Sequence, residues 1–260
     1  MIKLPHIDSG QSFDFGKSAQ DYAKYRDIYP ASFYEKLLFF GIGTPEQSVL
    51  DLGTGSGVIP RNMLGHGAKF TGADISPDQI AQAKVLSAGM NMDYIVCPAN
   101  QTGLPDNAFD AVTAAQCFWY FDVPATIAEV HRILKPGGRF AVLSMIGLPR
   151  ESAVLAKSEE LVLKYNPDWN GNDFDRMKLE PFDWADELFY AETLHTYIEE
   201  LEFTREAWCG RMRACRGVGA SLPPDLVAEY DKEHDAALKE LAGDIFTIPH
   251  QILMNIYRAK

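Results

Sequence analysis

Three glycines alternate with other residues directly after a short apolar run, in Val49-Leu50-Asp51-Leu52-Gly53-Thr54-Gly55-Ser56-Gly57. Alternate glycines let a backbone turn sharply and bring its N–H groups close to a ligand, with the positive end of a following helix nearby. A dinucleotide fingerprint, G-x-G-x-x-G, fails here because its last position would be Val58 or Pro60. A P-loop fails as well, because no lysine lies between residues 49 and 60. The loop therefore indicates a small-molecule site and disfavours a polyphosphate ligand.

Two acidic residues flank this loop in the chain. Asp51 lies at its entrance, and Asp74 ends the next apolar run. A carboxylate at the end of a strand can accept hydrogen bonds from both hydroxyls of a ribose, and Asp51 can face an ammonium group directly or through water. A nucleoside with a cationic tail would satisfy both acids.

The elements that position these residues alternate between short apolar runs and helical patterns from about residue 48 to 146. This alternation predicts βα units and a mostly parallel sheet. The expected strands cover residues 48–52, 69–74, 94–97, 109–114 and 139–145. The expected helices cover residues 57–64, 77–88 and 125–134, the second with Ser76 as its N-cap and Pro77 at its first position.

The alternation stops near residue 150. Helices are expected over 151–165, 204–216 and 224–241, whereas residues 166–183 lack periodicity and suit a surface insertion or a lid. A strand is expected over 196–203. A last strand is expected within 244–257, where Pro249 indicates an edge position or a bulge.

Three stretches in this order resemble the class I S-adenosylmethionine-dependent methyltransferases: Asp51-x-Gly53-x-Gly55-x-Gly57, Gly72-Ala73-Asp74-Ile75-Ser76 and Glu129-Val130-His131-Arg132-Ile133-Leu134-Lys135-Pro136-Gly137-Gly138. Within that superfamily the chain is similar to the methyltransferase type 11 group, which is related to trans-aconitate methyltransferase and to the ubiquinone and menaquinone biosynthesis methyltransferases. The resemblance covers roughly residues 15–146.

The resemblance implies an α/β fold: a Rossmann-like, doubly wound, mostly parallel seven-stranded sheet with a helical cap insertion. Residues 1–150 would form the cofactor-binding core with N-terminal covering helices. Residues 151–243 would form a mainly helical substrate cap, interrupted by a core strand near 194–203. Residues 244–260 would add the final strand of the core sheet.

The resemblance also assigns residues to S-adenosyl-L-methionine. Gly53, Gly55 and Gly57, with Thr54 between them, would approach its methionine and ribose portions, beside Asp51. Asp74 would bind the ribose hydroxyls, with Ile75 against the adenine. The family often has Ala-Glu where this chain has Ala99-Asn100, so Asn100 and Gln101 become the candidates at the adenine edge.

Further residues are implied around the methyl group and the acceptor. Tyr22 and Arg26 lie in a segment, residues 22–30, that is similar to a helix covering the cofactor, and they would reach its methionine end. Gln116 would lie by the transferring methyl group. The candidates for contact with the substrate are Trp119, Tyr120, Arg211 and Arg216. No catalytic residue and no metal ligand set is identified.

The expected function is in-line transfer of a methyl group to an O, N or C atom of a small molecule, by a cytoplasmic transferase that is a monomer or a homodimer. The cofactor is already activated by its charge, so the protein mainly positions the reactants. A non-catalytic S-adenosylmethionine-binding protein or sensor of the same fold is the alternative. A dehydrogenase that uses NAD is disfavoured by the missing fingerprint.

The composition excludes several other classes of protein. Lys and Arg total 24 against 36 for Asp and Glu, which gives a formal net charge of −12. Such a charge repels phosphate backbones and anionic lipid, so neither nucleic acid nor a membrane is expected as a partner. Hydrophobic residues make up 47% of the chain, a typical globular value, and no stretch approaches the length of a membrane span.

Overall fold

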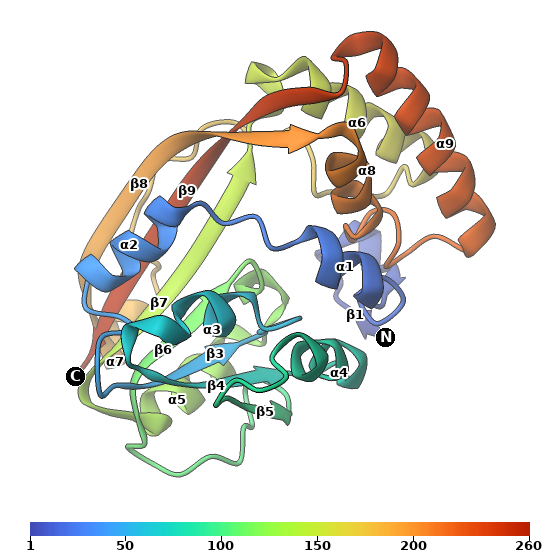
Figure 1. Cartoon of the computed structure of the whole chain (residues 1–260). Coiled ribbons are helices and arrows are strands. Elements are labelled where there is room, and N and C mark those ends of the chain that lie inside the picture. Colours follow the sequence, from blue (N-terminus) through green and yellow to red (C-terminus); the bar gives the residue numbers. More distant parts are fainter. The chain divides into compact units, whose positions relative to one another are not determined.

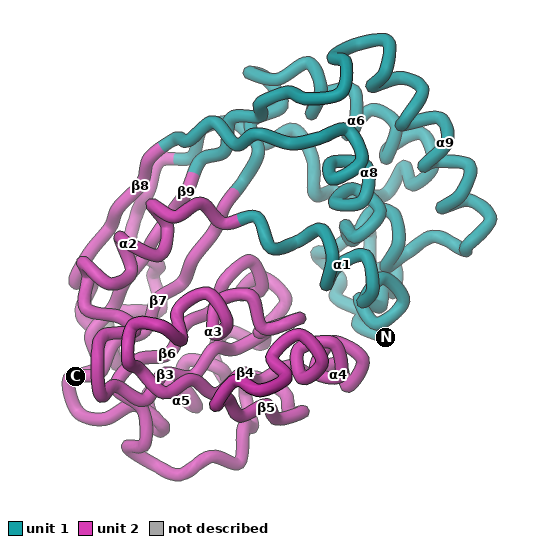
Figure 2. The backbone as a smooth tube through the Cα atoms, viewed as in Figure 1, with its two compact units in different colours: residues 1–28, 146–177, 198–251 teal, residues 29–145, 178–197, 252–260 magenta. Residues whose placement is uncertain are grey.

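The computed structural model describes residues 1–260, apart from the side chain of residue 186. The chain forms two compact units (Figure 2). Unit 1 contains Met1–Ile28, Ile146–Met177 and Ile198–Gln251, and unit 2 contains Tyr29–Met145, Lys178–Tyr197 and Ile252–Lys260.

A seven-stranded sheet has the strand order β5-β4-β3-β6-β7-β9-β8 (Figure 1). Its members are β3 (Ser48–Leu52), β4 (Lys69–Asp74), β5 (Asp93–Val96), β6 (Phe109–Ala115), β7 (Leu134–Gly147), β8 (Phe189–Thr204) and β9 (Ile245–Ala259). The strands from β5 to β7 in this order pair in parallel. The fold class predicted from the sequence is therefore confirmed. Because β4 and β6 lie on opposite sides of β3, the carboxyl ends of β3 and β6 form a topological switch point, where α/β sheets bind ligands.

The helices of unit 2 are α2 (Ala31–Phe39), α3 (Val58–Met63), α4 (Pro77–Leu86), α5 (Val123–Ile133) and α7 (Ala185–Leu188), with short 3₁₀ turns at Leu64–His66 and Phe118–Tyr120. Helix α4 begins as predicted: Pro77 is its first residue, and the Ser76 hydroxyl accepts a hydrogen bond of 3.4 Å from the Gln79 N–H. Asp122 caps α5 in the same way, through the Ala125 N–H at 3.3 Å.

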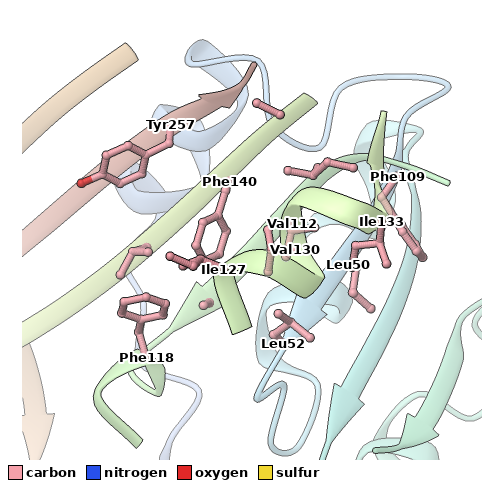
Figure 3. Close-up of a cluster of buried hydrophobic side chains, with 14 of the residues drawn as sticks. Leu50, Leu52, Phe109, Val112, Phe118, Ile127, Val130, Ile133, Phe140 and Tyr257 are labelled. Carbon is pink, nitrogen blue, oxygen red and sulfur yellow. The ribbon is translucent and has the colours of Figure 1, made fainter. Parts of the chain in front are cut away.

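The core of unit 2 lies between α5 and the sheet (Figure 3). The helix places residues three apart, Ile127, Val130 and Ile133, on one face, and they are buried with Leu50 of β3 and Val112 of β6. Val130, Ile133, Leu50 and Val112 have no exposed surface. This packing fixes β3 and β6 side by side, so the loops that follow them start from rigid positions.

Unit 1 is built mainly from helices around a second core. Its elements are β1 (Ile2–Lys3), β2 (Ser12–Phe13), α1 (Ala19–Tyr25), α6 (Ala153–Tyr165), α8 (Arg205–Arg213) and α9 (Pro224–Leu241), with 3₁₀ turns at Asp8–Gly10 and Pro149–Glu151. Helix α8 packs against α1 and α9, and α6 packs against α9. Trp208 and Tyr230, both fully buried, lie in the core between these helices.

Several predicted boundaries are wrong, each for a local reason. Strand β7 begins at Leu134 rather than 139, because Leu134 already pairs with Phe109 before a shift of register. Strand β8 begins at Phe189 rather than 196. Helix α8 ends at Arg213 rather than 216, because the chain turns back and the Gly219 N–H donates to the Arg213 carbonyl at 2.9 Å.

Of the two alternatives that Pro249 indicates, an edge position or a bulge, the edge position is wrong, because β9 lies between β7 and β8. Pro249 has no N–H to donate, but its carbonyl accepts a hydrogen bond of 3.0 Å from the Leu148 N–H. No helix among the described residues is both long and apolar enough to cross a bilayer.

Candidate functional site

The glycine loop of unit 2 takes a backbone conformation that side chains oppose. Gly53, Gly55 and Gly57 have φ angles of +63°, +55° and +77°. A Cβ atom on Gly53 would lie 2.7 Å from the Cys117 Sγ, and one on Gly57 would lie 2.3 Å from the Tyr94 hydroxyl. Backbone conformation therefore favours glycine at all three positions, and space requires it at Gly53 and Gly57 as well.

Asp74 ties the end of β4 to this loop. Its Oδ2 accepts the Gly55 N–H at 2.9 Å, and its Oδ1 accepts the Ser76 N–H at 2.8 Å. Each carboxylate oxygen has two lone-pair sites, so each can accept one further hydrogen bond. Burial raises the pKa of Asp74, and the backbone N–H groups of Ser76, Gly55 and Ile75 oppose that rise. The next residue, Ile75, is 57% exposed and offers an apolar surface beside the carboxylate.

Asp51 is buried below the loop. Register pairs it with Thr113 of β6, and the Thr113 hydroxyl donates to the Asp51 Oδ1 at 2.6 Å. Burial, together with the charge of Asp74, raises the pKa of Asp51 to about 6, although hydrogen bonds from Thr113 and Thr54 oppose the rise. An acid in this setting gains more from a nearby cation than an exposed one would.

Gln116, the residue after β6, carries two signs of a constrained position. Its φ is +59°, which is rare outside glycine. Its side-chain Nε2 donates to the Met145 carbonyl, while Oε1 is buried without a hydrogen-bond partner among the described residues. The amide is thus fixed with its acceptor oxygen unsatisfied. Strained backbone and orphaned polar atoms concentrate at functional sites.

Other predicted residues of unit 2 lie at the ends of β5 and β6. Asn100 and Gln101 are exposed and follow β5, which is joined to β4 by the hydrogen bond from the Cys97 N–H to the Asp74 carbonyl. Trp119 is 40% exposed, and its ring lies 5.7 Å from that of Tyr120. These side chains, with the glycine loop and the two acids, follow or end parallel strands of one sheet.

The remaining predicted residues belong to unit 1. The Arg26 guanidinium lies 5.3 Å from the centre of the Tyr22 ring. Arg216 forms a buried ion pair with Asp8 at 3.3 Å. Arg211 is also buried and lies beside a histidine. The roles of all these residues toward a ligand stay predictions.

Sequence reasoning missed the side chains that hold the loop from below. Tyr94 pairs in register with Gly72, and a Cβ on Gly72 would lie 2.7 Å from the Tyr94 ring. The Tyr94 hydroxyl is held by Ser87 at 2.8 Å, and the Cys117 thiol donates to the Leu52 carbonyl at 3.2 Å. The only signal in the sequence was Gly72 inside the strand expected over residues 69–74, because a glycine within a strand often marks a close approach of another group.

Comparisons with known proteins identify part of the chain. Residues 50–142 match the family model described as a methyltransferase domain. The chain is 42% identical over 102 residues to a ubiquinone/menaquinone biosynthesis C-methyltransferase of Desulfotalea psychrophila, covering 36% of this chain and 40% of that protein. It is 36% identical over 107 residues to a demethylmenaquinone methyltransferase of Thermus thermophilus, covering 39% and 49%.

Solved structures match over a longer stretch. A putative type II methyltransferase from Anaeromyxobacter dehalogenans has a TM-score of 0.58 at 22% identity, covering 89% of this chain and 97% of that one. A putative methyltransferase from Bacillus halodurans has a TM-score of 0.55 at 18% identity, covering 88% and 99%. At these identities the likeness shows the fold.

The resemblance to a methyltransferase stated from the sequence is confirmed for residues 50–142, which match a methyltransferase domain. The alignments span only 40% and 49% of the length of the two curated relatives. What those relatives act on is therefore not transferred by similarity.

Proposed function

We propose that the protein transfers a methyl group from S-adenosylmethionine to an O, N or C atom of a small molecule. The observation that carries this proposal is the arrangement around the glycine loop. Asp74 bridges the loop and β4 while keeping an acceptor site on each oxygen, and Asp51 lies buried below. This set of acceptors fits the two ribose hydroxyls and the ammonium group of that cofactor.

The fit extends to the other parts of the molecule. Gly53, Gly55 and Gly57, with Thr54, would approach the ribose and methionine portions, and Ile75 would cover the adenine, whose edge would lie by Asn100 and Gln101. When bound, S-adenosylmethionine supplies a methyl group made electrophilic by the positive charge on its sulfur. The protein then has to orient the acceptor and exclude water. The transfer does not in general require an acidic or basic side chain.

Gln116 would lie at the methyl end of this site, where its fixed amide oxygen can accept a hydrogen bond from the acceptor or the cofactor. Trp119 and Tyr120 would contact the acceptor, and Tyr22 and Arg26 would contact the methionine end. In this proposal residues 1–150 bind the cofactor, and the mainly helical residues 151–243 select the acceptor. Nucleic acid is not the substrate, consistent with the charge of −12.

Product formation distinguishes an enzyme from a non-catalytic binding protein. Purified protein would be incubated with S-adenosylmethionine and single phenols, hydroquinones, carboxylic acids or amines, and S-adenosylhomocysteine would be measured by mass spectrometry. Hydroquinones are included because two relatives are named for quinone biosynthesis. The proposal is supported if S-adenosylhomocysteine forms only when an acceptor is present and does not form with the Asp74→Ala variant. Tight cofactor binding without product from any class would favour the binding protein instead.

A further inference from the structure

Residues 129–138, one of the three stretches on which the resemblance rests, lie apart in the sequence from the glycine loop and its two acids. The first of them, Glu129, lies on α5 and has a side chain that is only 10% exposed. The nearby Val130 and Ile133 are fully buried against the sheet, so α5 has a fixed place in the core of unit 2. Glu129 is therefore a carboxylate on a rigid element of this unit.

Two partners share the Glu129 carboxylate. Its Oε1 accepts the Thr102 N–H at 2.9 Å and also the Thr102 hydroxyl. The Arg132 guanidinium donates to both oxygens, from Nε to Oε2 at 2.8 Å and from Nη2 to Oε1 at 2.7 Å. The bonds from Arg132, and then those from Thr102, lower the pKa of Glu129 to about 2, although burial opposes this. The carboxylate therefore stays charged at neutral pH and connects α5 to Thr102.

Thr102 belongs to the loop that joins β5 to β6, residues 97–108. It is only 7% exposed, whereas its neighbours Gln101 and Gly103, and Asn100 before them, are exposed. The Thr102 hydroxyl also accepts the Leu104 N–H at 3.2 Å. One buried threonine thus attaches an otherwise exposed part of this loop to α5.

The two ends of the loop are held by other bonds within unit 2. At its start, the Cys97 N–H donates to the Asp74 carbonyl at 3.1 Å. Near its end, the Arg132 guanidinium forms an ion pair with Asp106. The attachment to Glu129 lies between these two, directly after the two residues proposed for the adenine edge.

We propose that Glu129 is a positioning residue for cofactor binding, and that it acts through Thr102. It fixes the loop so that Asn100 and Gln101 present their amides to the edge of the adenine. This inference rests on the proposed function. A side-chain amide can accept a hydrogen bond from the 6-amino group of adenine and donate one to a ring nitrogen. Ordering such a side chain only on binding would lower the affinity by about 2- to 12-fold, so a loop that is ordered beforehand binds more tightly.

A pair of ligands separates positioning from a purely architectural role. S-adenosylhomocysteine and its analogue with purine in place of adenine differ only in the 6-amino group. The ratio of their two dissociation constants measures recognition of that group, and a general loss of stability in a protein that stays folded leaves the ratio unchanged. Calorimetry on the full-length protein gives both constants, and urea unfolding gives the stability.

Two variants of Glu129 and one control are compared with the wild type. Glu129→Ala removes the carboxylate. Glu129→Gln keeps one oxygen that can accept from Thr102 but loses the charge that pairs with Arg132. Asp110→Asn is the matched control, because Asp110 also joins a backbone N–H, that of Ser48, to a cation.

We expect the wild type to bind S-adenosylhomocysteine at least about threefold more tightly than the purine analogue. Glu129→Ala should weaken S-adenosylhomocysteine by at least about threefold and lower the ratio to about one, because the loop is then ordered only on binding. Glu129→Gln and Asp110→Asn should both keep the wild-type ratio.

Three results would overturn the inference. The first is a wild-type ratio near one, which would mean that the amino group is not recognised. The second is a Glu129→Ala variant that is less stable but keeps the wild-type ratio, which would leave Glu129 with an architectural role. The third is loss of the ratio in Glu129→Gln as well, which would assign the effect to the ion pair with Arg132.

Thr102→Val replaces Glu129→Ala if that variant fails to fold. It removes the hydroxyl that donates to Glu129 and keeps the side chain's size, so its ratio should also fall, and an unchanged ratio would overturn the inference. Failure of the wild-type protein to bind S-adenosylhomocysteine would instead refute the proposed function.

Discussion

Replacing Asp74 by Asn tests the cofactor site at the residue that joins its parts. The carboxylate accepts two backbone N–H groups, from Gly55 at 2.9 Å and Ser76 at 2.8 Å, and its two remaining acceptor sites are proposed for the ribose hydroxyls. An amide keeps one acceptor oxygen and turns an NH₂ group toward one of the two N–H donors. The variant therefore loses one bond to the backbone and one to the ribose, along with the charge.

The expected loss of binding follows from these bonds. A hydrogen bond to a charged group contributes about 1.5–3 kcal/mol, so Asp74→Asn should weaken S-adenosylhomocysteine by about 10- to 150-fold. The effect on folding should be smaller, because the lost N–H bond is partly offset by removal of a buried charge. Isothermal titration calorimetry gives the affinity, and urea unfolding gives the stability.

Asp110, near the amino end of β6, provides a matched control at the opposite ends of the parallel strands. Its carboxylate also accepts a strand N–H, from Ser48 at 2.8 Å, and it pairs with Lys135 at 2.8 Å. Ser48 begins β3, whereas Asp74 ends β4, and these strands are parallel. Asp110→Asn should therefore affect stability without affecting binding. Affinity of Asp74→Asn within about twofold of wild type would refute the placement of the ribose.

Four further substitutions test the glycine loop, Asp51, His234 and Gln116. Gly53→Ala should lower the unfolding free energy by about 2 kcal/mol or more, because φ is +63° and the new Cβ would clash with the Cys117 thiol. The control Gly65→Ala should be nearly neutral in the same urea titration, because nothing lies within 4 Å of its new Cβ. Because burial raises the pKa of Asp51 to about 6, the unfolding free energy of the wild type should fall by up to about 3 kcal/mol as pH rises from about 4 to 6. Asp51→Asn should remove this fall, so the variant should be more stable than the wild type at about pH 7.5. Calorimetry should show that the same variant binds the cofactor more weakly. Burial lowers the pKa of His234 to about 4, so the unfolding free energy should fall by about 3 kcal/mol as pH falls from about 6.5 to 4. His234→Gln should show a flatter dependence of unfolding free energy on pH over that range. Gln116→Met, which removes the orphaned acceptor oxygen, should lower turnover about tenfold with a smaller change in cofactor affinity, and equal turnover would contradict its proposed place.

The sequence predicted best what depends on neighbouring residues. Ser76 and Pro77 set the start of α4, and residues 224–241 gave the full extent of α9, because caps and helical periodicity are local signals. The glycine loop was also predictable, since three alternate glycines directly after an apolar run indicate a sharp turn at the end of a strand. Its left-handed backbone confirms that requirement.

The contacts between distant segments were not predictable. Tyr94 reaches Gly57 only because the sheet brings β5 beside β4, and the hydrogen bond between Asp51 and Thr113 depends on strand register. Arg211 lies within the helix expected over residues 204–216, but its burial beside His250 was not predictable. Helical periodicity alone does not show how a second core is arranged around such a charge.

Calorimetric titration of S-adenosylmethionine, and separately of NAD, into the purified protein would show whether the protein binds the cofactor of a methyltransferase. Mass spectrometry would first exclude a co-purified ligand. We expect micromolar binding of S-adenosylmethionine or its demethylated product, lost with Asp74→Ala, and no binding of NAD. If folded protein free of other ligands binds neither S-adenosylmethionine nor its demethylated product, the proposed cofactor is wrong.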